Sequence, residues 1–141
     1  MATRRRLYVD SSAYLAVLLG EEDSAGVASE LASGADFVSS TLLVLEVRRA
    51  LVHRSRAKKL PAADYQRATE RLQEDLRHFR LKDLSLDLCQ DARIPDVSTP
   101  RSLDLAHLAT AMWFHGQEPL TRFLSLDRDQ LQAARELGLP I

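Results

Sequence analysis

The chain has 141 residues, of which 45% are hydrophobic and 28% charged, and its formal net charge is −1. This length fits one domain with its own hydrophobic core, and the composition excludes a disordered chain. A single cysteine excludes an intramolecular disulfide, and the small net charge gives no overall attraction to nucleic acid. We therefore expect one domain spanning residues 1–141, in the reducing environment of the cytoplasm.

The N-terminal region begins like an export signal but does not continue as one. Three consecutive arginines, residues 4–6, precede an apolar stretch. Asp10 and two serines then interrupt that stretch, and the apolar run at 13–19 is too short to cross a bilayer. We expect neither export nor insertion into a membrane.

Short apolar β-type runs alternate with helical patterns, which predicts an α/β fold with a mainly parallel sheet. In the first half of the chain, strands are expected at 7–9, 37–39 and 79–81. The helices expected in this half are 11–19 (capped by Ser11 or Ser12), 22–32, a long helix from Ser40 or Thr41 to about residue 56, and a helix that starts at residue 62 after Pro61.

The second half of the chain continues the same alternation of strands and helices. The expected elements are a polar helix at 86–92, a proline-containing loop at 93–101, a very apolar helix at 105–114, a strand at 122–126, a helix at 128–137 and a short final strand at 139–141. The predicted fold is therefore a twisted, mainly parallel sheet of about five strands flanked by helices.

Four acidic residues occupy positions that are unusual for surface acids. Asp10 and Asp127 follow predicted strands, Asp104 precedes the apolar helix, and Glu46 lies among five apolar residues of a helix. In open α/β sheets, ligands bind beyond the carboxyl ends of the strands. Clustered carboxylates repel one another without a cation, and their hard oxygen atoms suit Mg²⁺ or Mn²⁺. The pattern indicates a metal-dependent site that acts on a phosphoryl group.

Each of these acids also has a purely structural interpretation. The acids at strand ends and helix starts could each cap the helix that follows. Glu46 could pair with Arg49 one turn later, and His107 could hydrogen-bond to Asp104. The segment 127–130 has an acid followed three residues later by glutamine, which resembles a capping box.

A basic run follows Glu46 on the same predicted helix. Residues 47–63 contain no acid. By itself such a run is most often a solvated helix face, but beside an RNA site it would contact phosphates or a protein partner. The candidate residues for binding RNA or an antitoxin are Arg48, Arg49, Arg54 and Arg56.

With these residues in view, the chain resembles a PIN domain and, within that superfamily, the VapC toxins of bacterial and archaeal toxin–antitoxin pairs. The segments that carry the resemblance are 8–13, 40–47, 103–111, 123–129 and 133–139, which follow the order and spacing of the family. Each motif is loose on its own, whereas the ordered set covers nearly the whole chain.

The resemblance implies a homodimer, a VapB-like antitoxin that inhibits it, and metal-dependent endonucleolytic cleavage of RNA such as tRNA, rRNA or mRNA. It implies that an acidic quartet holds Mg²⁺ or Mn²⁺ and carries catalysis: Asp10, Glu46, Asp104 and Asp127. It assigns auxiliary roles to Ser11, Ser125 and Asp129. The family often has a hydroxyl three residues before its glutamate, and here that residue is Leu43.

Two other enzyme classes fit the sequence less well. A phosphatase with an aspartyl nucleophile could use Asp10, but haloacid-dehalogenase-type enzymes need a second aspartate where this chain has Ser12. A phosphorylatable receiver domain needs a late lysine, and no lysine follows Lys82. The alternative outside enzymes is a catalytically silent PIN-like module that binds RNA or serves as a scaffold. Such modules usually lack one of the four acids.

Overall fold

The computed structural model describes residues 4–98 and 101–141. In this part of the chain, four strands form one parallel sheet in the order β3-β2-β1-β4. The strands are β1 (Arg6–Val9), β2 (Asp36–Ser40), β3 (Phe79–Lys82) and β4 (Arg122–Leu124). All three strand pairs are parallel, which confirms the predicted α/β fold.

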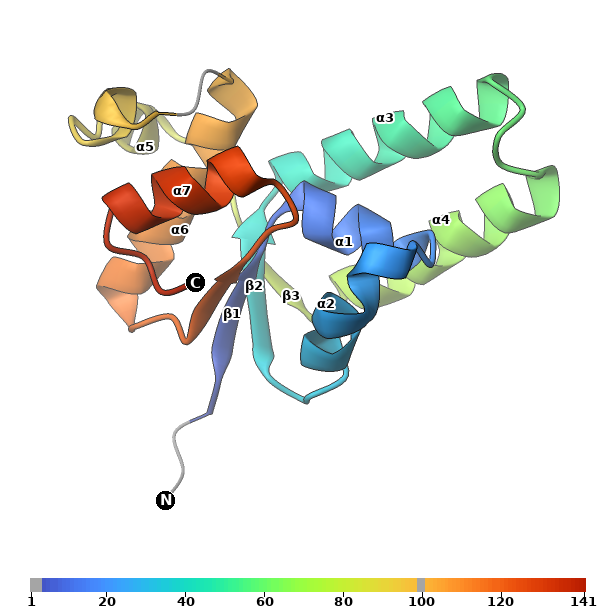
Figure 1. Cartoon of the computed structure of the whole chain (residues 1–141), viewed down its shortest axis with the longest axis horizontal. Helices are drawn as coiled ribbons and strands as arrows, with labels where there is room; N and C mark the ends of the chain where they lie inside the picture. The colour runs from blue at the N-terminus through green and yellow to red at the C-terminus, as the bar shows by residue number, and fades with distance from the viewer. Residues whose placement is uncertain (1–3, 99–100) are drawn as a thin grey trace.

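Helices cover both faces of this sheet (Figure 1). The described α-helices are α1 (Ser11–Leu18), α2 (Ala25–Leu31), α3 (Leu42–Arg56), α4 (Ala62–Leu76), α5 (Leu86–Cys89), α6 (Ser102–Gln117) and α7 (Arg128–Glu136). Short 3-10 turns, Glu22–Ser24 and Ile94–Asp96, precede α2 and α6. None of the described helices is both long and apolar enough to span a lipid bilayer.

The central strand β1 is buried on both faces. Leu7 and Val9 pack on one side with residues of α1, α2, α3 and α4. Tyr8, which alternates with them, packs on the other side with residues of α6 and α7. Because side chains of a strand alternate between faces, burial on both sides explains why β1 is a continuous apolar run in the sequence.

The C-terminal segment lies beside β4 without forming a strand. The main-chain N–H of Phe123 donates a 2.7 Å hydrogen bond to the carbonyl oxygen of Pro140. Proline has no N–H to donate in return, so a strand ladder does not extend through it. The predicted strand at 139–141 is therefore wrong, and the described sheet has four strands instead of about five.

Other boundaries shift by a few residues. The apolar helix α6 begins at Ser102 and continues through Gly116, so Asp104 lies inside its first turn. The predicted helix at 86–92 is a single turn that ends at Cys89. The loop predicted at 93–101 contains a 3-10 turn, and its residues 99 and 100 lie outside the described part of the chain. Strand β4 ends at Leu124, before the predicted end at residue 126.

The strand order predicts a crevice for a ligand at the carboxyl ends of β1 and β4. These neighbouring strands continue into α1 and α7, which lie on opposite sides of the sheet (Figure 1). Where the connections of adjacent parallel strands diverge in this way, the loops leave space for a ligand. Asp10 follows β1, and Ser125 and Asp127 follow β4 at this edge.

Candidate active site

Asp10 connects β1 to α1 and is almost completely buried, with 4% of its surface exposed. Its Oδ1 accepts hydrogen bonds from the N–H of Ala13 at 2.9 Å and the hydroxyl of Ser12 at 2.8 Å. Asp10 is thus the N-cap of α1, in place of the predicted Ser11 or Ser12. Burial raises the pKa of the Asp10 carboxyl, and hydrogen bonds from Ser125, Ala13 and Ser12 oppose this shift. A nearby cation would favour its charged form.

Glu46 reaches the same end of the sheet from α3. Its Oε1 accepts a 2.8 Å hydrogen bond from the hydroxyl of Ser11 and lies 2.7 Å from Nε2 of His107. Arg49, the alternative helical partner, lines a groove that does not include Glu46. Tertiary contacts with β1–α1 and α6 therefore hold Glu46 at the crevice.

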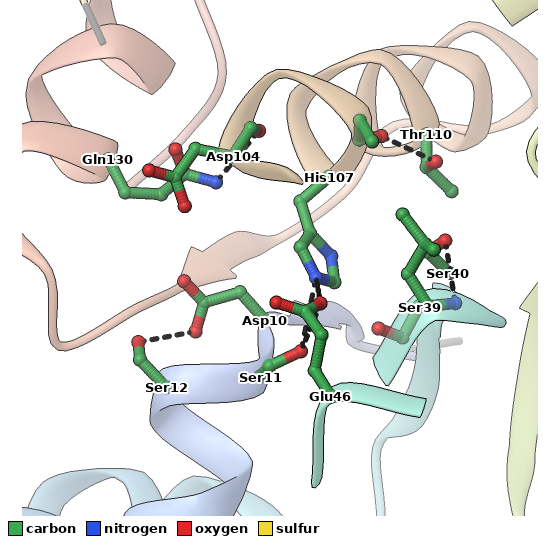
Figure 2. Close-up of polar contacts among 12 residues, drawn as sticks. Asp10, Ser11, Ser12, Ser39, Ser40, Glu46, Asp104, His107, Thr110 and Gln130 are labelled. Carbon is green, nitrogen blue, oxygen red and sulfur yellow. Dashed lines mark hydrogen bonds and ion pairs between the residues drawn. The ribbon is translucent and has the colours of Figure 1, made fainter. Parts of the chain in front are cut away.

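Asp104 lies in the first turn of α6, whose N-cap is Arg101. Its main-chain carbonyl oxygen accepts a 3.1 Å hydrogen bond from Nε2 of Gln130, a residue with no exposed surface. Figure 2 shows the carboxyl groups of Asp10, Glu46 and Asp104 facing a common space below the start of α6. Three acids that are far apart in the sequence therefore come to the same end of the sheet.

Asp127 caps α7, as the sequence allowed. Its Oδ1 accepts hydrogen bonds from the N–H groups of Asp129 at 2.9 Å and Gln130 at 3.3 Å. The N–H of Asp127 in turn donates to Oγ of Ser125, which lies 3.3 Å from Oγ of Ser12. Because Ser12 also binds the Asp10 carboxylate, hydroxyl groups link the acids that follow β1 and β4. Asp129 itself is exposed.

The donors of this site are suited to a hard cation, since carboxylate and hydroxyl oxygens are what Mg²⁺ and Mn²⁺ prefer. Within residues 4–98 and 101–141, no group of three or more His, Cys, Asp or Glu side chains is close enough together to hold a metal ion by itself. Mg²⁺ commonly keeps several waters and binds one or two carboxylates, so it does not need a closed protein cage. The residues present therefore fit a hydrated divalent ion held by few direct ligands.

The family model of the PIN domain matches residues 7–136. The chain belongs to the PIN domain family. None of the curated proteins compared with the chain matches it. PIN domains are generally nucleases and typically use divalent metal ions, which agrees with the nuclease-type fold inferred from the sequence. The VapC subgroup, the homodimer and the identity of the metal stay predictions.

Sequence reasoning offered Asp104 as a partner of His107 and did not identify its contacts with Tyr8, Glu46 and Ser11 in this PIN domain. Its Nδ1 lies 2.7 Å from the hydroxyl of Tyr8, and its Nε2 lies 2.7 Å from Glu46 and 3.1 Å from Ser11. The sequence signal was an isolated imidazole on an otherwise apolar helix. A buried side chain of this kind needs hydrogen-bond partners, but its position in the sequence does not reveal which ones.

The candidate basic residues of the PIN domain divide between two faces of α3. Arg48, Arg49 and Arg56 line a groove of about 560 Å³ between α3 and α4, together with Tyr65. These two helices form an antiparallel pair that extends away from the sheet (Figure 1). This groove also contains Leu45, whose surface is 66% exposed. The groove thus combines positive charge with apolar surface.

Arg54 lies on another face of the same helix. Its Nη2 is 3.3 Å from Oε1 of Glu21, and it lines a groove of about 450 Å³ that also includes Ser12 and Asp127. Arg54 therefore shares a groove with the candidate acid Asp127.

Proposed function

We propose that this PIN domain is a Mg²⁺- or Mn²⁺-dependent endoribonuclease that acts in the cytoplasm as the VapC-type toxin of a toxin–antitoxin pair. The observation that supports the enzyme activity is that separate elements bring Asp10, Glu46 and Asp104 to one end of the sheet (Figure 2). Asp127, which follows β4, is linked to the same edge through the hydroxyls of Ser125 and Ser12.

In this proposal the acids have two tasks. Asp10, Asp104 and Asp127 hold the cation directly or through water, and Glu46 orients or deprotonates the attacking water. When bound, the cation lowers the pKa of water and neutralises charge on the phosphoryl group. In-line attack by water would leave a 5′-phosphate on one RNA product.

The test is cleavage of structured RNA by the purified chain, with Mg²⁺, with Mn²⁺ and with excess EDTA. Asp10→Asn preserves the shape of the side chain and removes its charge, so we expect it to abolish cleavage. Asp87→Asn, at an exposed position of α5, is the matched control and should cleave like the unmodified chain.

Three results would contradict the enzyme proposal. Full activity in EDTA would exclude the metal-dependent mechanism, and 2′,3′-cyclic phosphate ends would exclude attack by water. Metal-independent RNA binding with no cleavage by the unmodified chain would instead support a catalytically silent RNA-binding or scaffold module. RNA ends and RNA binding are therefore measured in the same preparations.

The toxin role adds two partners. A VapB-like antitoxin would inhibit the PIN domain by placing an arginine at the acids, where a carboxylate–guanidinium contact can be bidentate. A second copy would form the homodimer. Light scattering tests the dimer, and a structure of the complex tests the inhibition: acids that stay open to solvent with no basic residue beside them would exclude this mode.

A further inference from the structure

A buried chain of hydrogen bonds leads from the core of the sheet to Glu46. The hydroxyl of Tyr8 is 2.7 Å from Nδ1 of His107, and Nε2 of the same ring is 2.7 Å from Oε1 of Glu46. Tyr8 has no exposed surface and His107 has 2%. One imidazole therefore connects β1, α6 and α3 at the candidate active site, and Figure 2 shows its contact with Glu46.

Aromatic packing fixes the direction of this chain. The ring of Tyr8 stacks on Phe123, with centroids 5.2 Å apart and planes 8° apart. It meets the ring of His107 edge-on, at 81° and 5.9 Å between centroids. Because the phenol ring is held between these neighbours, its hydroxyl is presented to Nδ1 of His107 at a fixed place.

The same contacts determine where the imidazole hydrogen lies. A carboxylate oxygen only accepts hydrogen bonds, so the 2.7 Å contact between Nε2 and Oε1 of Glu46 places a hydrogen on Nε2. In the neutral ring Nδ1 is then the acceptor, and the Tyr8 hydroxyl, 2.7 Å away, donates to it. Nε2–H then donates to the Glu46 carboxylate.

Two donors consequently converge on one oxygen of Glu46. Oε1 accepts from the hydroxyl of Ser11 at 2.8 Å and from Nε2–H of His107. In the described residues no hydrogen bond is made to Oε2, and the Glu46 side chain is 25% exposed. This arrangement orients the carboxylate by one oxygen and leaves the other available at the crevice.

We propose that His107, oriented by Tyr8, is a positioning residue that fixes Glu46 with Oε2 directed to the attacking water. The inference rests on the proposed nuclease function, in which Glu46 acts on that water. His107 does not touch the RNA or the reacting atoms in this scheme. Removing its Nε2–H would therefore lower turnover and leave the affinity for RNA unchanged.

Two variants of His107 separate positioning from packing. His107→Leu fills the space without a donor, whereas His107→Gln retains an amide N–H near the position of Nε2. Residues that orient the side chains of a metal site commonly contribute roughly 10–100-fold to activity, so we expect kcat to fall by about that factor in His107→Leu with little change in KM. His107→Gln should recover part of the loss. Circular dichroism and thermal melting of each variant report folding.

A double-mutant cycle with Glu46→Gln tests whether His107 acts through Glu46. If it does, His107→Leu should not lower the residual kcat of Glu46→Gln further. Equal losses in the two backgrounds, or an unchanged kcat in well-folded His107→Leu, would overturn the inference.

Nitrogen-15 NMR of histidine in the metal-free protein gives a readout that does not depend on activity. We expect His107 to carry its hydrogen on Nε2, and Tyr8→Phe to change the Nδ1 signal. A hydrogen on Nδ1, with Nε2 as an acceptor, would overturn the inference even in an inactive protein. If instead the unmodified chain shows the expected tautomer but no metal-dependent cleavage, the proposed nuclease function fails together with the kinetic role of His107, while the hydrogen-bond assignment stands.

Discussion

Nε2 of Gln130 donates a 3.1 Å hydrogen bond to the main-chain carbonyl oxygen of Asp104, which joins the first turns of α7 and α6. The N–H of the same residue donates to the carboxylate of Asp127 at 3.3 Å. Gln130 is completely buried. One side chain therefore fixes the separation of two helices that each carry a candidate metal ligand.

The first prediction concerns Gln130→Leu, which removes this link with little change in volume. Oε1 of Gln130 is buried without a hydrogen-bond partner in the described residues. Gln130→Leu removes this unpaired oxygen, which stabilises the folded chain and offsets the loss of the hydrogen bond from Nε2. We expect the unfolding free energy to change by less than about 1 kcal/mol. RNA cleavage should fall roughly 10-fold or more, because the positions of Asp104 and Asp127 would loosen. Chemical denaturation and initial cleavage rates measure the two effects; a loss of stability without a loss of rate would contradict the prediction.

The second prediction concerns metal binding by Asp104. A ligand that binds only the folded chain stabilises it by mass action, and Mg²⁺ or Mn²⁺ at ten times its Kd would add about 1.4 kcal/mol. For a chain of this size, that raises the melting temperature by roughly 4 °C. Asp104→Asn should show a much smaller shift, whereas Asp87→Asn should match the unmodified chain. Equal shifts in all three proteins would exclude Asp104 as a ligand.

The third prediction follows from the burial of Asp10, which raises its pKa in the folded state. Between the pKa of an unfolded aspartate, about 3.9, and the higher folded value, the folded chain binds more protons than the unfolded chain. The contribution of Asp10 to the unfolding free energy is therefore fully present below the unfolded pKa and is lost as pH rises through the folded pKa.

Asp10→Asn, which can still cap α1, should remove this pH dependence in the metal-free protein. Urea denaturation in EDTA at several pH values gives the comparison. A difference between the unmodified chain and Asp10→Asn that stays constant with pH would contradict the assignment.

The fourth prediction separates the two arginine faces of α3. Arg54→Gln should weaken binding of all RNA sequences about equally, because Arg54 lines a groove with Asp127. A plot of the logarithm of the RNA-binding constant against the logarithm of the salt concentration should become less steep by about one unit. A triple change of Arg48, Arg49 and Arg56 to Gln should instead weaken binding of the antitoxin, since an amphipathic partner suits the mixed basic and apolar groove that these residues line. Binding titrations at several salt concentrations measure both, with each variant as the control for the other. The division fails if both variants lose the same partner to the same extent.

The fifth prediction concerns stability away from the crevice. The hydroxyl of the buried Tyr14 donates a 2.6 Å hydrogen bond to Oδ2 of Asp75, which also lies 3.5 Å from Nε of Arg71. Hydrogen bonds to charged groups contribute about 1.5–3 kcal/mol to stability. Because Asp75 would still have Arg71 as a partner, we expect Tyr14→Phe to lower the unfolding free energy by roughly 1–2 kcal/mol. The control, Tyr65→Phe, lacks such a bond in the described structure and should change little. The denaturant midpoints of both variants measure the two effects, and equal midpoints would contradict the prediction.

Local sequence patterns identified most of the strands and helices in the described residues. The apolar run of β1 and the helical spacing of α4 are visible over a few residues, because each reflects burial of a continuous face. Pro140 shows where this approach failed, since its neighbours have strand-like side chains but its main chain cannot continue a ladder. The start of α6 was also missed, because Arg101 gives no side-chain cap and so no local signal.

The sequence by itself placed Asp10 and Asp127 after strands and Glu46 in an apolar helix, which was enough to propose an acidic site. Only the tertiary structure decided that Glu46 bonds to His107, 61 residues away, and not to its helical neighbour Arg49. The tertiary structure also decided which arginine shares a groove with Asp127. Propensity and periodicity depend on residues within a few positions of one another, whereas these contacts depend on strand order and on how α3 and α6 pack across the sheet. No short segment of the sequence encodes that packing.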